Sequence, residues 1–191
     1  MKKTVLGIFA IVSALTASAQ TAAPDFNFET WAAVSPPFAT MEDPQGWASL
    51  NALNVVGTPI SVTKETASPY SGAISCKIST VDVSGAAIPN PFRPGFDFDT
   101  AGFIGIGSIV PFPSPSIEFG YTYSPWRPAM LSFASKYTPV SGDSAFVFAY
   151  LTRWNGTSRD TIADGIYSTG ATTTSYSVNT ITMNYKPAFS T

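Results

Sequence analysis

The sequence contains no histidine and only one cysteine, Cys76, among its 191 residues. The absence of histidine excludes the Ser-His-Asp and Cys-His machinery of many hydrolases, as well as the usual zinc sites. A single cysteine cannot form an intramolecular disulfide, so the fold depends on the size of its core. Apolar residues alternate around Cys76 in Ile74-Ser75-Cys76-Lys77-Ile78, which predicts that Cys76 points inward as a small hydrophobic residue.

Long apolar runs are absent, except for a short one near the N-terminus. Val5 to Leu15 follows the positive residues Lys2 and Lys3 and precedes Ala17-Ser18-Ala19, the pattern of a secretory signal peptide and its cleavage site. The run is shorter than the roughly 20 apolar residues that a membrane helix needs, so we expect no membrane insertion. The sequence predicts a signal peptide over 1–19 and one domain over 20–191. We therefore expect an exported protein, in the periplasm, at the cell surface or outside the cell.

Charge is scarce as well, at 12% of residues against roughly 25% in an average domain. Once Lys2 and Lys3 are removed with the signal peptide, eight basic and twelve acidic residues leave a net charge of −4. Nucleic acids and anionic lipid surfaces both attract clusters of lysine and arginine, and the chain has none. We therefore expect neither as a partner.

Helical periodicity is missing after the signal peptide, and alternation of apolar and polar residues takes its place. Many short strands separated by turn signals are typical of an antiparallel β-sandwich or barrel, so the pattern predicts an all-β fold. The expected strands are 60–66, 73–83, 103–110, 117–123, 130–137, 145–154, 161–167 and 176–185. Gly142-Asp143 and Asn155-Gly156 are the clearest turn signals, the second being typical of a hairpin.

The strand expected at 145–154 is apolar on both faces, which predicts a central strand covered on both sides. Phe146, Phe148, Tyr150 and Trp154 share one face, and Trp154 is expected in the core or as a cover of the hairpin. In the last strand the alternation changes phase near Asn179-Thr180, which predicts a β-bulge there.

Catalytic chemistry has few candidates in this sequence. Gly102, Gly105 and Gly107 lack the following helix that a phosphate loop needs. A pair of carboxylates would suffice for glycoside hydrolysis. The candidates are Glu29, Asp97, Asp99, Glu118, Asp143, Asp160 and Asp164. Several of them lie beside glycine or before a strand and are equally well explained as turn residues.

Aromatic residues are the stronger signal. Sugars present flat C–H faces that pack on aromatic rings, while polar neighbours bind their hydroxyls. Trp126 lies between prolines in Tyr123-Ser124-Pro125-Trp126-Arg127-Pro128, which predicts a loop position. The predicted carbohydrate-binding residues are Trp126, Arg127, Tyr121, Tyr123 and Trp47. A structural role stays open for each, because large aromatics usually pack in the core, where we expect Trp31.

The sequence offers one weak metal signal. Asp25 and Glu29, with Glu42 and Asp43, supply oxygen ligands near the first strand and are candidates for a structural Ca²⁺. Solvated acidic residues are the alternative, and no calcium-loop motif supports the site. No other cofactor is expected.

Several short motifs resemble one known family. They are Asn27-Phe28-Glu29-Thr30-Trp31, Pro44-Gln45-Gly46-Trp47, Tyr70-Ser71-Gly72, Lys136-Tyr137 with Pro139 and Gly142-Asp143, Trp154-Asn155 and Arg159-Asp160. In these motifs the chain resembles the carbohydrate-metabolism domain family of secreted Gram-negative bacterial proteins. The resemblance implies a jelly-roll-like β-sandwich, similar to carbohydrate-binding modules, and a role in glycan binding or processing. Members of that family continue through further strands, which leaves open that this sandwich is truncated and belongs to a longer chain with further domains.

Three hypotheses follow from these observations. The first is a secreted, non-catalytic carbohydrate-binding module. The second is a structural or adhesive β-sandwich of a larger cell-surface protein, in which the aromatic residues are buried. The third is a glycoside-active enzyme with two carboxylates facing each other across a cleft.

Overall fold

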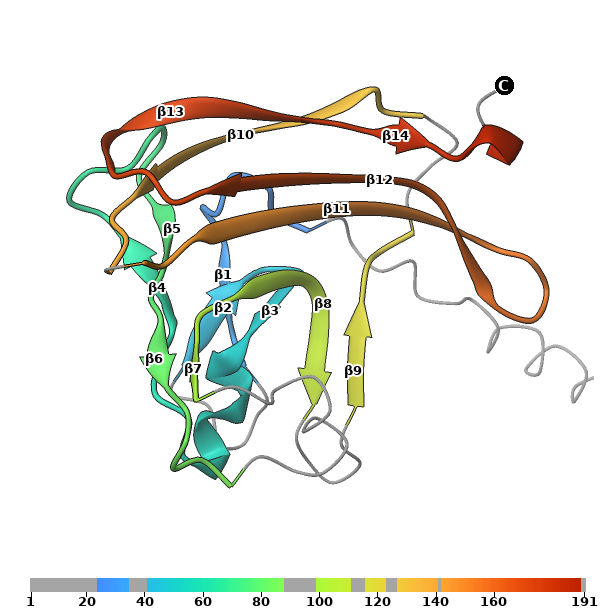
Figure 1. Cartoon of the computed structure of the whole chain (residues 1–191). Coiled ribbons are helices and arrows are strands. Elements are labelled where there is room, and N and C mark those ends of the chain that lie inside the picture. The colour runs from blue at the N-terminus through green and yellow to red at the C-terminus, as the bar shows by residue number, and fades with distance from the viewer. Residues whose placement is uncertain are drawn as a thin grey trace, which may run out of the picture. The chain divides into compact units, whose positions relative to one another are not determined.

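The computed structural model describes residues 24–34, 41–87, 99–110, 116–122, 127–140 and 142–189. The expected all-β class is confirmed, since the elements are almost entirely antiparallel strands (Figure 1). The signal peptide, Asp97, Tyr123 and Trp126 lie outside the described residues. The contacts group the chain into two compact units, Met1–Tyr123 and Ser124–Thr191, which are described separately below. The single domain expected over 20–191 stays a prediction.

The first unit is a set of short antiparallel pairings. β3 (Trp47–Ser49), β8 (Ile104–Val110) and β9 (Ser116–Phe119) form a three-stranded sheet in that order. The remaining strands form pairs: β1 (Trp31–Ala33) with β2 (Glu42–Pro44), β4 (Val62–Glu65) with β5 (Ser75–Ile78), and β6 (Val81–Asp82) with β7 (Thr100–Ala101). The single strand expected at 73–83 is therefore two strands, β5 and β6, which pair with different partners.

A 3-10 helix, η2 (Leu50–Val56), was not predicted from the sequence. It begins where the Ser49 hydroxyl caps the amide of Asn51, and it ends at Gly57 with a φ of 95°, a left-handed conformation that favours glycine. Its first turn lies at the centre of the unit. The core of the unit consists of Ala48, Leu50, Ala52, Leu53, Val83, Ala101 and Ile109.

Asn51 joins three elements through buried hydrogen bonds. Its side-chain oxygen accepts from the amides of Ser61 and Val62, at 3.0 and 3.2 Å. Its Nδ2 donates to the carbonyls of Glu42 and Val62 and to the carboxylate of Asp43. A buried amide donor without a partner is costly, so this one side chain fixes β2, η2 and the start of β4 relative to one another.

The second unit contains the long strands. β10 (Met130–Tyr137) pairs with β13 (Thr173–Thr182), while β11 (Ala145–Trp154), β12 (Arg159–Thr169) and β14 (Asn184–Tyr185) form a second sheet in that order. The short helix η4 (Pro187–Phe189) follows. The turn expected at Asn155-Gly156 joins β11 to β12, where the Asn155 amide donates to the Ser158 carbonyl at 3.0 Å.

These two sheets pack on each other. The rings of Phe133 in β10 and Tyr167 in β12 meet edge to face, with centroids 5.2 Å apart. A Cβ added to Gly165 in β12 would lie 2.7 Å from the Thr182 carbonyl oxygen and would also collide with Ile181 of β13. Glycine at this position therefore allows the backbones of β12 and β13 to approach closely.

Several expectations about these strands were wrong in detail. Among the described strands β11 is not central but an edge strand that pairs with β12 alone, and its Phe146, Phe148, Tyr150 and Trp154 side chains are exposed. The irregularity of β13 lies at the pairs of Ser135 and Tyr137, not at Asn179-Thr180, where the register is continuous. Alternation identifies which residues share a face, but it does not say which neighbours or layers cover that face.

The expectation for the strand around Cys76 was correct only in part. Ile74 and Cys76 are half-buried, while Ile78 on the same face is exposed. Burial, together with the negative charge of Asp43, raises the pKa of the Cys76 thiol to about 12.

Among the described residues, no helix is long and apolar enough to cross a bilayer.

Candidate functional site

The candidate site begins with a tight turn that precedes β1. The carboxylate of Asp25 accepts hydrogen bonds from the backbone amides of Asn27, at 3.0 Å, and Thr30. Burial acts to raise the pKa of Asp25, but these amide donors outweigh it and hold the pKa below its usual 3.8. The turn is anchored to the β2–β3 hairpin, because the Asp25 amide donates to the Gln45 carbonyl and the Gln45 amide donates to the Thr30 carbonyl.

Phe28 occupies an unusual backbone conformation within this turn. Its φ is 61°, in the left-handed region that a bulky residue rarely adopts. Its carbonyl accepts a hydrogen bond from the Trp31 indole at 2.7 Å. Conformations of this kind cost of order 1–3 kcal/mol and are found at sites where the surroundings enforce them.

The turn places two phenylalanines against Trp47. The Phe26 ring meets the Trp47 ring edge to face at 6.0 Å, and the Phe28 ring lies 5.2 Å from it on a tilted plane. Phe26 also contacts Tyr121, with centroids 5.9 Å apart. We call Phe26, Phe28, Trp47 and Tyr121 the aromatic cluster. The structure thus links Trp47 and Tyr121, two of the predicted ligand-binding residues, through a phenylalanine that the sequence analysis did not select.

The Trp47 ring is fixed within this cluster. Its Nε1 donates a hydrogen bond to the Asp25 carbonyl at 3.0 Å, so its polar edge is satisfied and its orientation is set. Trp47, Phe28 and Tyr121 are half-buried, while 49% of the surface of Phe26 is exposed. The cluster therefore combines a rigid base with one ring that is open to solvent.

Of the other predicted ligand-binding residues, the structure describes Arg127 alone. Arg127 belongs to the second unit, where it is exposed and its guanidinium carbon lies 5.8 Å from the centre of the Tyr185 ring. Trp126 and Tyr123 are outside the described residues, so their role in binding stays a prediction. Trp31, expected in the core, is half-buried and has the Lys64 ammonium 5.4 Å from its ring centre.

Two of the four calcium candidates, Asp25 and Glu29, accept hydrogen bonds from backbone amides in this structure. Glu29 accepts from the amides of Ala73 and Ile74, at 3.0 and 3.3 Å, and so ties the N-terminal turn to the β4–β5 connection. Asp25 is used in the turn described above. Within the described part of the chain, no group of three or more acidic, cysteine or histidine side chains could hold a metal ion.

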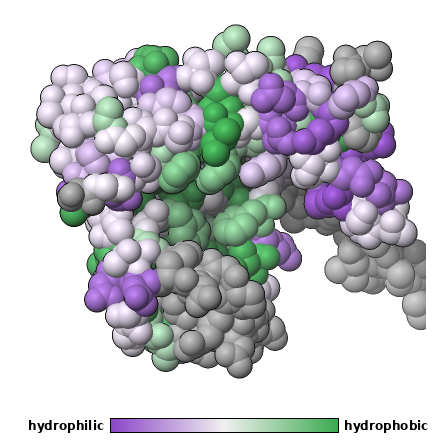
Figure 2. All heavy atoms as spheres, viewed as in Figure 1, coloured by the Kyte–Doolittle hydropathy of each residue, from purple (hydrophilic) through white to green (hydrophobic). Residues whose placement is uncertain are grey.

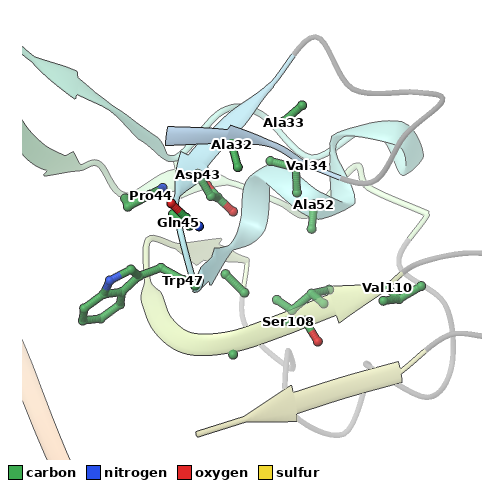
Figure 3. Close-up of a pocket in the computed structure, with 14 residues that line it drawn as sticks. Ala32, Ala33, Val34, Asp43, Pro44, Gln45, Trp47, Ala52, Ser108 and Val110 are labelled. Carbon is green, nitrogen blue, oxygen red and sulfur yellow. The ribbon is translucent and has the colours of Figure 1, made fainter. Parts of the chain in front are cut away.

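A pocket of about 270 Å³ lies beside the aromatic cluster, between β1, β2, η2 and β8. Figure 3 shows small side chains such as Ala32, Ala52 and Val110 along it, while the Trp47 indole points away from the other labelled residues. Asp43 is the one acidic residue among the described part of the lining, and its carboxylate accepts from the amide and hydroxyl of Ser49 at 3.0 and 2.7 Å. Burial raises the pKa of Asp43, although the Ser49 and Asn51 hydrogen bonds oppose the rise. We infer that Asp43 stabilises the fold of this unit, because its hydrogen-bond partners belong to the same buried network as Asn51.

Three of the described carboxylates proposed for catalysis are engaged locally. Asp164 forms an ion pair with Lys186 at 2.6 Å, Asp160 accepts from the Asn155 amide group at 2.9 Å, and Asp143 accepts from the Ser144 amide at 2.8 Å. Asp43 is the single carboxylate among the described residues that line the pocket, whereas glycoside hydrolysis requires a pair.

No model of a known protein family, no curated protein and no solved structure matches this chain. The geometry of the chain itself therefore carries the assignment of a candidate site. Of the residues that the sequence analysis missed, Phe26 and Phe28 carried a readable signal. They alternate with Asp25 and Asn27, two residues typical of turns, directly before a strand.

Proposed function

We propose that this protein is a non-catalytic carbohydrate-binding module and that the aromatic cluster of the first unit holds the sugar. The observation that supports this most directly is the fixed Trp47 ring, flanked by the half-exposed ring of Phe26. Rings held in one orientation bind at a low cost in conformational entropy, which favours packing against the C–H face of a sugar. The resemblance of the motifs Asn27 to Trp31 and Pro44 to Trp47 to the carbohydrate-metabolism domain family favours the same function.

The surroundings of the cluster suit a hydroxyl-rich ligand. Asn27 and Gln45 are exposed amide residues on the two turns that build the cluster, and an amide side chain both donates to and accepts from hydroxyls. The strained Phe28 and the Asp25 hydrogen bonds hold the cluster in place before a ligand arrives. The proposed role is to bind the sugar and release it with its covalent bonds unchanged.

A glycan array probed with the mature protein, residues 20–191, tests this proposal. The decisive variant is Phe26→Ala, because its ring is half-exposed and its removal leaves the Trp47–Asp25 hydrogen bond intact. We expect binding at least about tenfold weaker, equivalent to about 1.4 kcal/mol, in a protein that still folds although it loses two ring contacts worth about 0.5–1.5 kcal/mol each. Phe119→Ala is the matched control, since Phe119 is an exposed phenylalanine of the same unit outside the cluster.

Two outcomes would reject the proposal. The first is no binding to any plant, algal or host glycan. The second is a Phe26→Ala protein with a lower melting temperature and unchanged glycan affinity, which would instead support a structural or adhesive module.

A further inference from the structure

The second unit has an apolar face that its own fold leaves uncovered. The side chains of β11 alternate between two faces, and the outer face has Phe146, Phe148, Tyr150 and Trp154 on it. Ile166 of β12 lies on the same face, because it is the direct cross-strand partner of Phe148. We call these five residues the outer face. Figure 2 shows hydrophobic side chains at the surface in the region of β11.

The aromatic rings of the outer face share one orientation. The planes of Phe146 and Phe148 differ by 13° and those of Phe148 and Tyr150 by 11°, with centroids 6.1 and 6.3 Å apart. The three rings thus form a regular row along the strand, a surface suited to packing against a second ordered surface.

The opposite face of the same hairpin shows what a covered face looks like in this unit. There Ala163 is fully buried, Tyr167 contacts Phe133, and Gly165 lies against Ile181 and Thr182. The unit therefore uses one face of the β11–β12 hairpin to pack its two sheets together. The outer face has larger apolar side chains and, within the described part of the unit, no such cover.

The area of the outer face is sufficient for an interface. Phe146 and Phe148 are each 56% exposed, Tyr150 61%, Trp154 58% and Ile166 59%. With about 150–250 Å² per large side chain, the five residues expose roughly 550 Å². This lies at the upper end of the roughly 300–600 Å² that the largest apolar patch of a typical monomer exposes, and such patches are often functional. Two such faces in contact would bury about 1,100 Å², which reaches the lower limit of roughly 1,000 Å² for a specific interface.

We propose that a second copy of this chain covers the outer face, giving a dimer with twofold symmetry. In such a dimer the same patch serves both partners, and sheet packs against sheet as it does inside the unit. The centre of the patch is phenylalanine and isoleucine, which offer nothing to the hydroxyls of a sugar. Its borders are polar, with Arg159 opposite Trp154 and the Asp164–Lys186 ion pair opposite Tyr150. An apolar aromatic centre with a polar rim is the composition of a protein interface.

Sedimentation of the mature protein tests the dimer. We expect a dimer at micromolar concentration and, for Phe148→Lys, a dissociation constant raised at least about 100-fold, since a charge at the centre of the patch replaces a buried ring. Val178→Lys is the control, because Val178 is also exposed but lies on β13 of the other sheet. A wild-type monomer up to the highest soluble concentration would overturn the proposal, as would a dimer that Phe148→Lys leaves intact.

A second measurement covers the case in which Phe148→Lys fails to fold. In a Cys76→Ala background, Thr152→Cys places a thiol on the exposed outer side of β11 without altering the patch. We expect a thiol-reactive dye to label it at low protein concentration and more slowly as the concentration rises. Labelling that is independent of protein concentration would overturn the proposal: uniformly slow labelling would mean that the chain covers the face itself, and uniformly fast labelling that the face stays open.

This inference does not depend on the proposed glycan site, which lies in the other unit. A monomer that binds glycan through Phe26, or a dimer that binds none, would separate the two proposals. Should glycan protect the Thr152→Cys thiol of a monomeric protein, the outer face would be a sugar platform and the dimer would be rejected.

Discussion

Replacing Asn51 by alanine should destabilise the first unit more than any exposed substitution described above. The side chain makes five hydrogen bonds, and its loss leaves the buried amides of Ser61 and Val62 without an acceptor. Each unsatisfied buried donor costs about 1–3 kcal/mol, and water entering the space recovers part of the loss. We therefore expect the free energy of unfolding to fall by about 3–4 kcal/mol.

Asn54→Ala is the matched control for this experiment. Asn54 is the same residue type in the same helix, but it is half-buried and its side chain donates one hydrogen bond, to the Thr58 carbonyl at 2.7 Å. Its loss should cost about 1 kcal/mol. Urea unfolding followed by tryptophan fluorescence gives the stability of each variant, and amide hydrogen exchange reports on Ser61 and Val62 directly. Equal stability of the two variants, with the Ser61 and Val62 amides still protected in Asn51→Ala, would refute the structural role given to Asn51.

Three further predictions concern single residues. Burial raises the pKa of Asp43, so the carboxyl holds its proton more tightly in the folded than in the unfolded protein. Its contribution to the free energy of unfolding should therefore be complete below pH 3.8 and fall as pH rises through the folded-state pKa. The difference between the pH–stability curves of wild type and Asp43→Asn measures this contribution. The Cys76 thiol, with a pKa of about 12 instead of 9.0, should react with iodoacetamide at pH 8 about 1,000-fold more slowly than an unperturbed thiol; equal rates in native and urea-unfolded protein would contradict this. Gly165→Ala should lower the unfolding free energy by about 1–3 kcal/mol, because its Cβ meets β13, whereas Gly85→Ala, with open space around it, should be neutral in the same urea titration.

The strands of the second unit were predictable because their pattern is long and regular. The ranges 130–137 and 145–154 coincide with β10 and β11 to the residue. Helix η2 was missed because seven residues are too few for a helical period to stand out, although Leu50, Leu53 and Val56 recur every three residues, the period of a 3-10 helix. The available signals were Ser49 before it and Gly57 after it, the two caps that the structure uses.

The candidate site was predictable only as a collection of residue types. Trp47 and Tyr121 were selected as large aromatics, but nothing in their sequence positions indicates that both contact Phe26. That arrangement depends on the Asp25 turn and on its hydrogen bonds to the β2–β3 hairpin. Long-range contacts of this kind arise from the folded chain, and alternation along a strand carries no information about them.

The order of the strands in the second unit has a consequence for how the unit folds. The β11–β12 hairpin, closed by the short turn at Asn155, lies in the sequence between β10 and β13, which pair with each other. Hairpins with short loops close in microseconds, whereas joining β10 to β13 directly would first require ordering the long intervening chain. We therefore expect β11 and β12 to form first and bring the ends of their neighbours together, so that a weakened Asn155 turn would slow the folding of all four strands.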